Sequence, residues 1–280
     1  MDSKDFDLDL PNGRVHARRW GAEDRPAVFG VSGLTANLVC FGPLAEALVP
    51  AGFQLIAHDM RGRGRSDNTP AGSYGWPSHA QDIIALADRL GIERFDYIGW
   101  STGSLIGLHL HRLVPARLRR LVLLDQVAAA PQGILGVAER VIARLGETVP
   151  SLPGYIEAVA GMGLIRPWAE MWATYLEYEM EAVPGGYRSR TSKEAIMEDF
   201  EWDLVHDGRD LWTDVSCPVL LVRGMDPLTP DSGLVVPDDM FADYMAAVPA
   251  TEVLELNHAH YGVGTDEKTG AAVVEFFTRS

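Results

Sequence analysis

The residue of this sequence best placed to do covalent chemistry is Ser101. It lies in the run Gly99 to Gly103 (GWSTG), which fits the pattern G-x-S-x-G and stands between an apolar run and a segment of helical periodicity. The two glycines permit a sharp turn, because a Cβ at either position would clash with a neighbouring backbone segment. A serine at a helix N-terminus also lies near the positive end of the helix dipole, which favours a developing oxyanion. The pattern therefore predicts a serine nucleophile that attacks a carbonyl carbon.

Short apolar runs that end in polar or glycine-containing loops alternate with helical periodicities along most of the chain. The apolar runs cover residues 26–32, 53–59, 94–100, 118–125, 217–224 and 251–257. This alternation predicts an α/β fold with a mostly parallel central sheet flanked by helices. Ligands of such sheets bind at the carboxyl ends of the strands, where these loops lie. Residues 128–212 have helical spacing and no convincing strand, so we expect a helical cap inserted into a core of residues 1–127 and 213–280.

With these elements in place, the sequence resembles the α/β-hydrolase superfamily over essentially its whole length. Residues 32–35 (SGLT) occupy the place of the family's oxyanion loop, and residues 59–66 (DMRGRGRS) resemble its D-x-R-G-x-G-x-S turn. Asp226-Pro227 follows the penultimate strand, and residues 257–260 (NHAH) follow the last one. The sequence departs from the family at Ser32, where a histidine is usual. That histidine mainly supports the loop, so the departure affects the details of the oxyanion loop more than the reaction class.

The resemblance implies an oxyanion hole made by two backbone N–H groups, those of Leu34 and Thr102. Thr102 follows the nucleophile directly in the sequence. Because the backbone N–H groups would bind the oxyanion, the side chains at these two positions say little about whether the hole is present. The alternative is that Leu34 and Thr35 are ordinary loop residues.

A serine hydroxyl needs a neighbouring base, and the pKa of histidine suits that task near neutral pH. The family places this histidine after the last strand, where His258 and His260 both occur. Counting from the apolar run before them and back from the final helix favours His260. His258 is the alternative, and a third interpretation places both histidines on the surface.

Two aspartates compete for the role of the acid that orients this histidine. Asp226 lies at the usual site of the family, although its spacing from Gly224 is shorter than the common one. Asp125 ends the run LVLLD, and some relatives take their acid from that position. The loop SGLTANLVCFGPL also resembles that of hydrolases of acylated enamine dicarboxylates, a group that does so. The choice between the two stays open, and the other aspartate would serve as a turn or helix-capping residue.

Aromatic residues of the cap segment suggest the character of the substrate. One helical face is formed by Trp168, Met171, Trp172, Tyr175 and Leu176, at spacings of three and four residues. This face could simply pack on the core, but tryptophans of a cap often line the pocket beneath it, and Trp100 adds a wall beside the nucleophile. We therefore assign Trp100, Trp168 and Trp172 to binding of a medium-sized apolar or aromatic substrate. A weaker alternative is a substrate carboxylate held by Arg61, Arg63 and Arg65.

Composition and charge exclude several other classes of function. The formal net charge of −15 disfavours nucleic acid, which needs a basic surface, and no apolar run approaches the roughly 20 residues that span a bilayer. The first residues lack the features of a secretory signal, so a cytoplasmic location is expected. Cys40 and Cys217 have no metal or redox spacing, and we expect both to be buried. A small-molecule substrate without a cofactor is expected, and a homo-oligomer stays open.

The resemblance and the candidate residues together predict a serine hydrolase acting through Ser101, a histidine and an aspartate. Cleavage of an ester, a lactone, an amide or a C–C bond next to a carbonyl would use the same residues, so the sequence does not separate them. Two rivals share the fold. A cofactor-free oxygenase would use the histidine and acid as a base and would consume oxygen, and a ligand receptor would keep the pocket without turnover.

Overall fold

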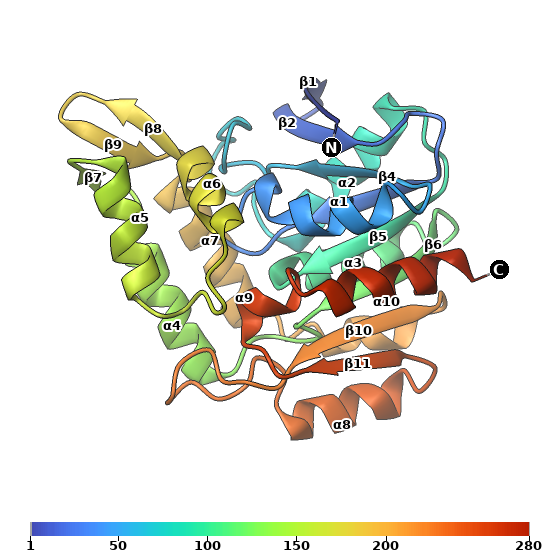
Figure 1. Cartoon of the computed structure of the whole chain (residues 1–280). Helices are drawn as coiled ribbons and strands as arrows, with labels where there is room; N and C mark the ends of the chain where they lie inside the picture. The colour runs from blue at the N-terminus through green and yellow to red at the C-terminus, as the bar shows by residue number, and fades with distance from the viewer. Residues whose placement is uncertain (1, 280) are drawn as a thin grey trace.

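The computed structural model of the chain describes residues 2–279 and is built around one eight-stranded sheet (Figure 1). The strands stand in the order β1-β2-β4-β3-β5-β6-β10-β11. Their bounds are β1 Ser3–Leu10, β2 Gly13–Trp20, β3 Ala27–Val31, β4 Gln54–His58, β5 Phe95–Trp100, β6 Leu118–Leu124, β10 Val219–Gly224 and β11 Glu252–Leu256. Every neighbouring pair from β4 to β11 is parallel, whereas β2 pairs antiparallel with both β1 and β4. The predicted mostly parallel sheet is confirmed.

The sequence analysis did not predict the hairpin of β1 and β2 at the edge of this sheet. Its outer strand alternates acidic and apolar residues (SKDFDLDL) and is largely exposed, so it lacks the continuous apolar run by which the inner strands were found. Ion pairs across the hairpin join Asp5 to Arg18 and Asp7 to Arg14. Charged side chains of this kind are common on edge strands, where they discourage pairing with another chain.

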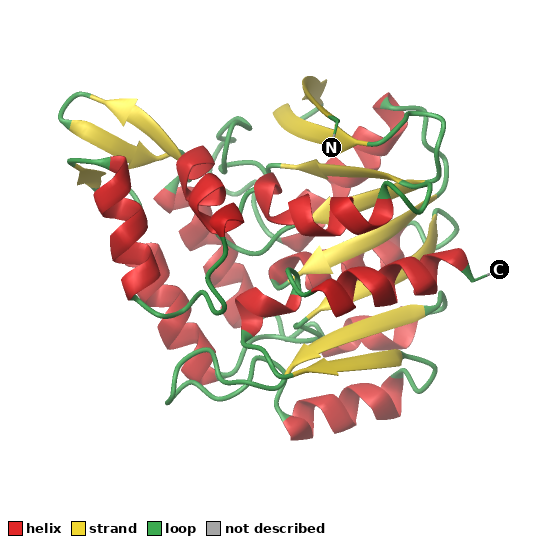
Figure 2. Ribbon diagram, in the orientation of Figure 1, coloured by secondary structure: helices red, strands yellow, loops and turns green. Residues whose placement is uncertain are grey.

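Helices cover both faces of the sheet, as buried parallel strands require (Figure 2). One face is covered by α2 Trp76–Arg89, α3 Thr102–Leu113, α8 Asp238–Ala247 and the short helix η2 Arg209–Asp214. The other face carries η1 Leu38–Phe41, α1 Gly42–Leu48 and α10 Glu267–Thr278. A short helix, α9 His260–Val263, follows β11. None of the helices in residues 2–279 combines the length and apolar character that crossing a membrane requires.

Residues 128–212, which we call the cap segment, lie between β6 and β10 in the chain and at the left of Figure 1. Their helices are α4 Gln132–Ala143, α5 Leu152–Gly161, α6 Glu170–Glu179 and α7 Lys193–Val205. The prediction of a purely helical segment is wrong in one respect: β7 Thr148–Val149, β8 Met180–Val183 and β9 Gly186–Ser189 form a small antiparallel sheet. Strands of two to four residues are too short to show a clear alternation of apolar and polar residues.

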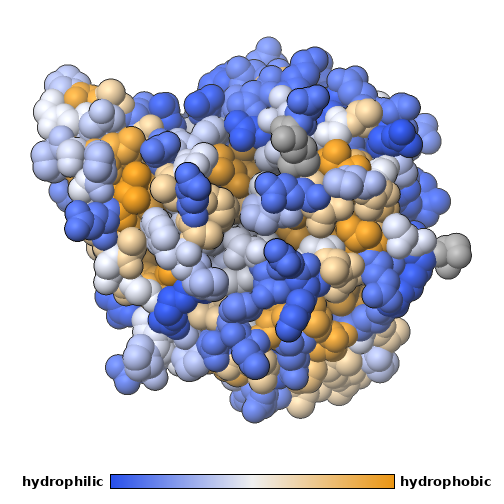
Figure 3. Space-filling view, in the orientation of Figure 1, coloured by the Kyte–Doolittle hydropathy of each residue, from blue (hydrophilic) through white to orange (hydrophobic). Residues whose placement is uncertain are grey.

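The surface of the cap segment is partly apolar on the side shown in Figure 3, where apolar atoms lie over α5. Leu152 and Ile156 of this helix are half-buried, and Met162 just after it is 53% exposed. By contrast, the surface of the hairpin of β1 and β2 is mostly hydrophilic in the same view. The outer surface of the cap segment is thus partly apolar, unlike that of the hairpin.

Candidate active site

Ser101 lies at the turn between β5 and α3, with a backbone φ of 56° and ψ of −129°. This conformation is strained for a residue with a side chain, by about 1–3 kcal/mol. The flanking glycines make the turn possible, because a Cβ on Gly99 would lie 2.3 Å from the carbonyl oxygen of Gly103, and one on Gly103 would lie 2.1 Å from that of Val31. The turn predicted from the sequence is present, and it places the Ser101 side chain at a cavity under the cap segment.

Asp125 follows β6 and is the partner of His260. Its Oδ2 accepts a hydrogen bond of 2.8 Å from Nδ1 of His260, and its Oδ1 accepts one of 2.8 Å from the backbone N–H of Gly224. The side chain is almost fully buried, and its backbone φ is 55°. Within residues 2–279, Ser101 and Asp125 are the two residues other than glycine with a positive φ. Strain of this kind concentrates at functional sites. The two strained residues are also the candidate nucleophile and one of the two candidate acids.

The structure does not bring the competing aspartate and histidine to Ser101. Asp226 is exposed, and its carboxylate makes no hydrogen bond or ion pair with any other residue between 2 and 279. Nε2 of His258 lies 2.6 Å from the carboxylate of Asp266, which lies before α10. This contact keeps His258 away from the cavity, which His260 lines. The offset counted from the sequence therefore agrees with the position of His260, and the short spacing from Gly224 leaves Asp226 in solvent.

The hydroxyl of Ser101 donates a hydrogen bond of 3.1 Å to Oε1 of Gln126. Gln126 is buried, and its own amide group donates to the carbonyl of Ala128, which holds the oxygen of the amide toward Ser101. The sequence analysis missed Gln126, although it follows Asp125 directly and so lies at the carboxyl end of the same strand. In this arrangement no hydrogen bond joins Ser101 to His260 among the described residues, although both side chains line the same cavity.

The cavity above Ser101 has a volume of about 120 Å³ and a mostly apolar lining. The cap segment contributes Ile134, Val137, Ala138, Val141, Trp172 and Tyr175, and the rest of the chain contributes, among others, Trp100 of β5, Leu228, and His260 and Tyr261 of α9. Trp172 is the centre of the aromatic wall: its ring packs edge to face against those of Trp100, Tyr175 and Tyr261, at centroid distances of 6.3, 5.4 and 5.7 Å.

The prediction that Trp168 lines the pocket is wrong. Its side chain is 39% exposed and does not reach the cavity. Helix α6 begins only at Glu170, so Trp168 belongs to the preceding loop and does not share the helical face of Trp172. Trp100 and Trp172, by contrast, both lie in the cavity wall.

Among the described residues, those that line the cavity include no lysine, arginine, aspartate or glutamate. The three arginines considered for a substrate carboxylate point elsewhere. Arg61 pairs with Asp82, Arg63 pairs with Asp199, and the Arg65 side chain lies in part over the ring of Tyr178 at the surface. For the part of the chain that the structure describes, the titratable groups in the lining are those of His260, Tyr175, Tyr261 and Cys40. Cys40 is buried as expected, whereas Cys217 is only half-buried.

The two backbone groups expected to form an oxyanion hole flank Ser101. Gly33 and Leu34 line the cavity, and a Cβ on Gly33 would lie 3.0 Å from Cβ of Ser101. Thr102 begins α3, and neither its backbone N–H nor that of Leu34 donates a hydrogen bond to another residue between 2 and 279. The hydroxyl of Ser32, where the resembled family has a histidine, is buried without a hydrogen-bond partner among the described residues. Among the described residues both N–H groups thus lack a hydrogen-bond acceptor, and Leu34 lines the cavity whereas Thr102 is buried beside it and is not part of the lining.

Residues 26–161 match the family model of the alpha/beta hydrolase fold. RutD of Variovorax paradoxus, named as a candidate carbamate hydrolase, is 34% identical over 40% of this chain and 42% of its own length. N-formylmaleamate deformylase of Pseudomonas putida is 32% identical over 42% of this chain and 43% of its own length. The chain thus spans about two fifths of the length of these curated relatives.

The whole chain is similar to a solved structure, that of E-2-(acetamidomethylene)succinate hydrolase. The TM-score is 0.89 at 24% sequence identity, and the match covers 99% of this chain and 100% of the other. At this identity the similarity shows the fold. The fold includes the cap segment, because the match extends over essentially every residue.

Proposed function

Because the chain belongs to the α/β-hydrolase superfamily, we propose that it is a serine hydrolase that cleaves a small, uncharged, largely apolar ester or amide through an acyl-enzyme at Ser101. The observation that carries the proposal is the hydrogen bond between Asp125 and His260, together with a strained Ser101 that lines the same apolar cavity as His260. Two relatives act on amide bonds according to their names, which favours an acyl group on nitrogen or oxygen as the target.

The proposed reaction begins when the Ser101 hydroxyl leaves Gln126 and turns toward His260. His260 takes the proton of the hydroxyl as the oxygen attacks the carbonyl carbon, and Asp125 stabilises the imidazolium through Nδ1. The negative charge that develops on the carbonyl oxygen is accepted by the backbone N–H groups of Leu34 and Thr102. His260 then gives its proton to the leaving oxygen or nitrogen, and a water molecule hydrolyses the ester formed with Ser101.

The lining of the cavity argues for an uncharged substrate. A carboxylate moved from water into this site would lose its hydration, and the lining residues between 2 and 279 include no lysine or arginine that would compensate for that loss. The names of the deformylase and of the succinate hydrolase indicate anionic substrates. We therefore propose that this chain differs from them in substrate charge while keeping the same reaction class. Aromatic and aliphatic side chains from the cap segment would bind the apolar part of the substrate.

A fluorophosphonate probe tests the reaction class, because it labels an activated serine without knowledge of the substrate. The wild type should be labelled on Ser101, and Ser101→Ala should not be labelled. Neutral acyl esters and amides of increasing size, each paired with an analogue that carries a carboxylate, then test the substrate class. The neutral member of each pair should have the higher kcat/KM. Absence of labelling would reject the serine hydrolase, and a preference for the anionic members would reject the proposed substrate class alone.

A further inference from the structure

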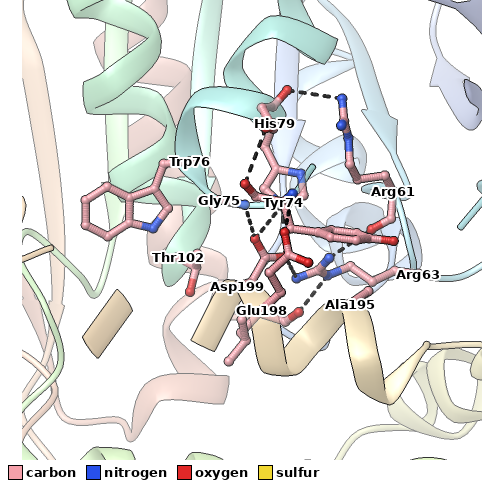
Figure 4. A network of polar contacts seen from close by, with 12 residues as sticks. Arg61, Arg63, Tyr74, Gly75, Trp76, His79, Thr102, Ala195, Glu198 and Asp199 are labelled. Carbon is pink, nitrogen blue, oxygen red and sulfur yellow. Dashed lines mark hydrogen bonds and ion pairs between the residues drawn. The ribbon is translucent and has the colours of Figure 1, made fainter. Parts of the chain in front are cut away.

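A buried network of ion pairs and hydrogen bonds joins helix α7 of the cap segment to the loops around Ser101. Its centre is Asp199, which lies on the buried side of α7 (Figure 4). The Asp199 carboxylate accepts hydrogen bonds from Arg63 at 2.7 Å, from the backbone N–H of Gly75 at 2.6 Å and from Nε2 of His79 at 3.0 Å. Burial alone would raise the pKa of Asp199, but the charges of His79 and Arg63 and their hydrogen bonds hold it below its ordinary value.

Arg63 connects this carboxylate to the candidate oxyanion loop. Its guanidinium is fully buried and uses three separate donors: Nη2 binds Asp199, Nη1 binds the carbonyl of Arg61 at 2.9 Å, and Nε binds the carbonyl of Leu34 at 2.6 Å. The bond to Leu34 holds the carbonyl group of that residue, whose N–H, in the preceding peptide group, is expected to donate to the oxyanion. A planar guanidinium spreads its donors over three nitrogens and so reaches these three separate acceptors, which the single nitrogen of a lysine ammonium does not reach from one position.

The same helix reaches the other side of the expected oxyanion hole one turn later. Asp203 accepts a hydrogen bond of 3.4 Å from the hydroxyl of Thr102 and one of 2.6 Å from Nε1 of Trp76. Thr102 carries the second of the two candidate N–H donors. Helix α7 therefore contacts the loop of Leu34 through Arg63 and the first residue of α3 directly.

We propose that Arg63 and Asp199 are positioning residues for the oxyanion hole, through which the packing of α7 on the core holds the main chain at Leu34 in place and thereby aims its N–H. This inference rests on the proposed function, because an oxyanion forms only if Ser101 attacks an acyl group. A misdirected Leu34 N–H would leave binding of the neutral substrate nearly intact, since the cavity walls supply that binding. It would lower the rate of the chemical step, in which charge develops on the carbonyl oxygen.

Arg61 offers a matched control from the same loop. It is as deeply buried as Arg63, and it makes a buried ion pair with an aspartate, Asp82 of α2. Its remaining donors bind the carbonyls of Ser73 and Ser78, and none of them contacts the loop of Leu34. Arg61→Lys and Arg63→Lys therefore remove the same kind of contact from the same turn, but only the second removes a contact to the oxyanion loop.

The experiment measures the rate of fluorophosphonate labelling of Ser101, and kcat and KM for a hydrolysed neutral ester, in the wild type and both lysine variants. Loss of an oxyanion-hole donor costs about 10²–10³ in kcat, so a displaced donor should cost at least about tenfold. We expect Arg63→Lys to slow labelling and to lower kcat by about tenfold or more, with KM changed by less than about threefold. Arg61→Lys should lower the melting temperature to a similar extent, with labelling within about twofold of the wild type.

Equal rates for the two lysine variants, or an effect of Arg63→Lys on KM alone, would overturn the inference. A wild type that is not labelled would instead refute the proposed function itself, so the two failures are distinguishable.

Asp199→Asn provides a second variant if Arg63→Lys does not fold. It keeps the shape of the side chain and removes the charge that holds Arg63, and we expect it to slow labelling at least about fivefold. Labelling of Asp199→Asn at the wild-type rate would also overturn the inference.

Discussion

Asp203 is expected to make the stability of the protein fall as the pH rises from about 4 to about 7. Its carboxyl group is buried under α7, and burial together with the nearby charge of Asp199 raises the pKa of Asp203 to about 7 from an ordinary value of 3.8. Hydrogen bonds from Trp76 and Thr102 and the charge of Arg63 act in the opposite direction but do not outweigh burial. The perturbation that tests this expectation is Asp203→Asn, which removes the ionisable group and keeps an oxygen that can accept from Trp76.

The sign and size of the effect follow from the two pKa values. Below about pH 4 the group is protonated in both the folded and the unfolded chain, so it imposes no penalty on folding. Between pH 4 and 7 the unfolded chain ionises while the folded chain stays protonated, and the folded state loses stability as the pH rises. One pKa unit corresponds to about 1.36 kcal/mol, so the full loss above pH 7 is on the order of 4 kcal/mol. Asparagine cannot ionise, so Asp203→Asn should avoid this loss.

Urea unfolding at pH 5, 6, 7 and 8 measures the effect, with the wild type and Asp203→Asn compared at each pH. The free energy of unfolding of the variant minus that of the wild type should increase by about 2 to 3 kcal/mol from pH 5 to pH 8. Any constant cost of the altered hydrogen bonds cancels in this increase. Glu201→Gln is the matched control, because it removes a carboxylate from the exposed side of the same helix. A difference for Asp203→Asn that does not vary with pH would refute the reasoning.

Three further predictions concern the residues around Ser101. Asp125→Asn should lower kcat by on the order of 10³–10⁴, as loss of an orienting carboxylate does in serine proteases, whereas Asp226→Asn should change kcat by less than about twofold because its carboxylate lies in solvent. Comparable losses in the two variants would count against Asp125 as the acid. His260→Ala should abolish fluorophosphonate labelling, and His258→Ala should mainly lower the melting temperature through its lost contact with Asp266; the reverse ranking would transfer the base to His258. Gln126→Leu should raise the labelling rate by about fivefold, because a net hydrogen bond of about 1 kcal/mol no longer holds the Ser101 hydroxyl. Slower labelling of that variant would mean that Gln126 assists the reaction.

The sequence predicted the structural features that depend on residues close together in the chain. The turn at Ser101 needs glycines at fixed offsets, and the inner strands of the sheet are continuous apolar runs because both of their faces are buried. Local patterns of this kind predicted six of the strands and the mostly parallel sheet. They were insufficient for the hairpin of β1 and β2 and for the short strands β7 to β9, whose pairing partners compensate for weak local preference.

The partner of His260 was decided only by the tertiary structure. Asp125 and Asp226 both follow strands that end at the same edge of the sheet, so chain position alone does not distinguish them. The buried, positive-φ conformation of Asp125 and its hydrogen bond from Gly224 depend on how β6 and β10 pair. The three arginines of the turn after β4 likewise have the same local sequence context. Their different partners, Asp82, Asp199 and Tyr178, lie on separate elements that only the packed fold brings near them. The sequence by itself determined which residue types stand at the ends of the strands, because that depends on local pattern. Which of them meet was decided by long-range packing, because contacts between residues far apart in the chain leave no periodic signal in the sequence.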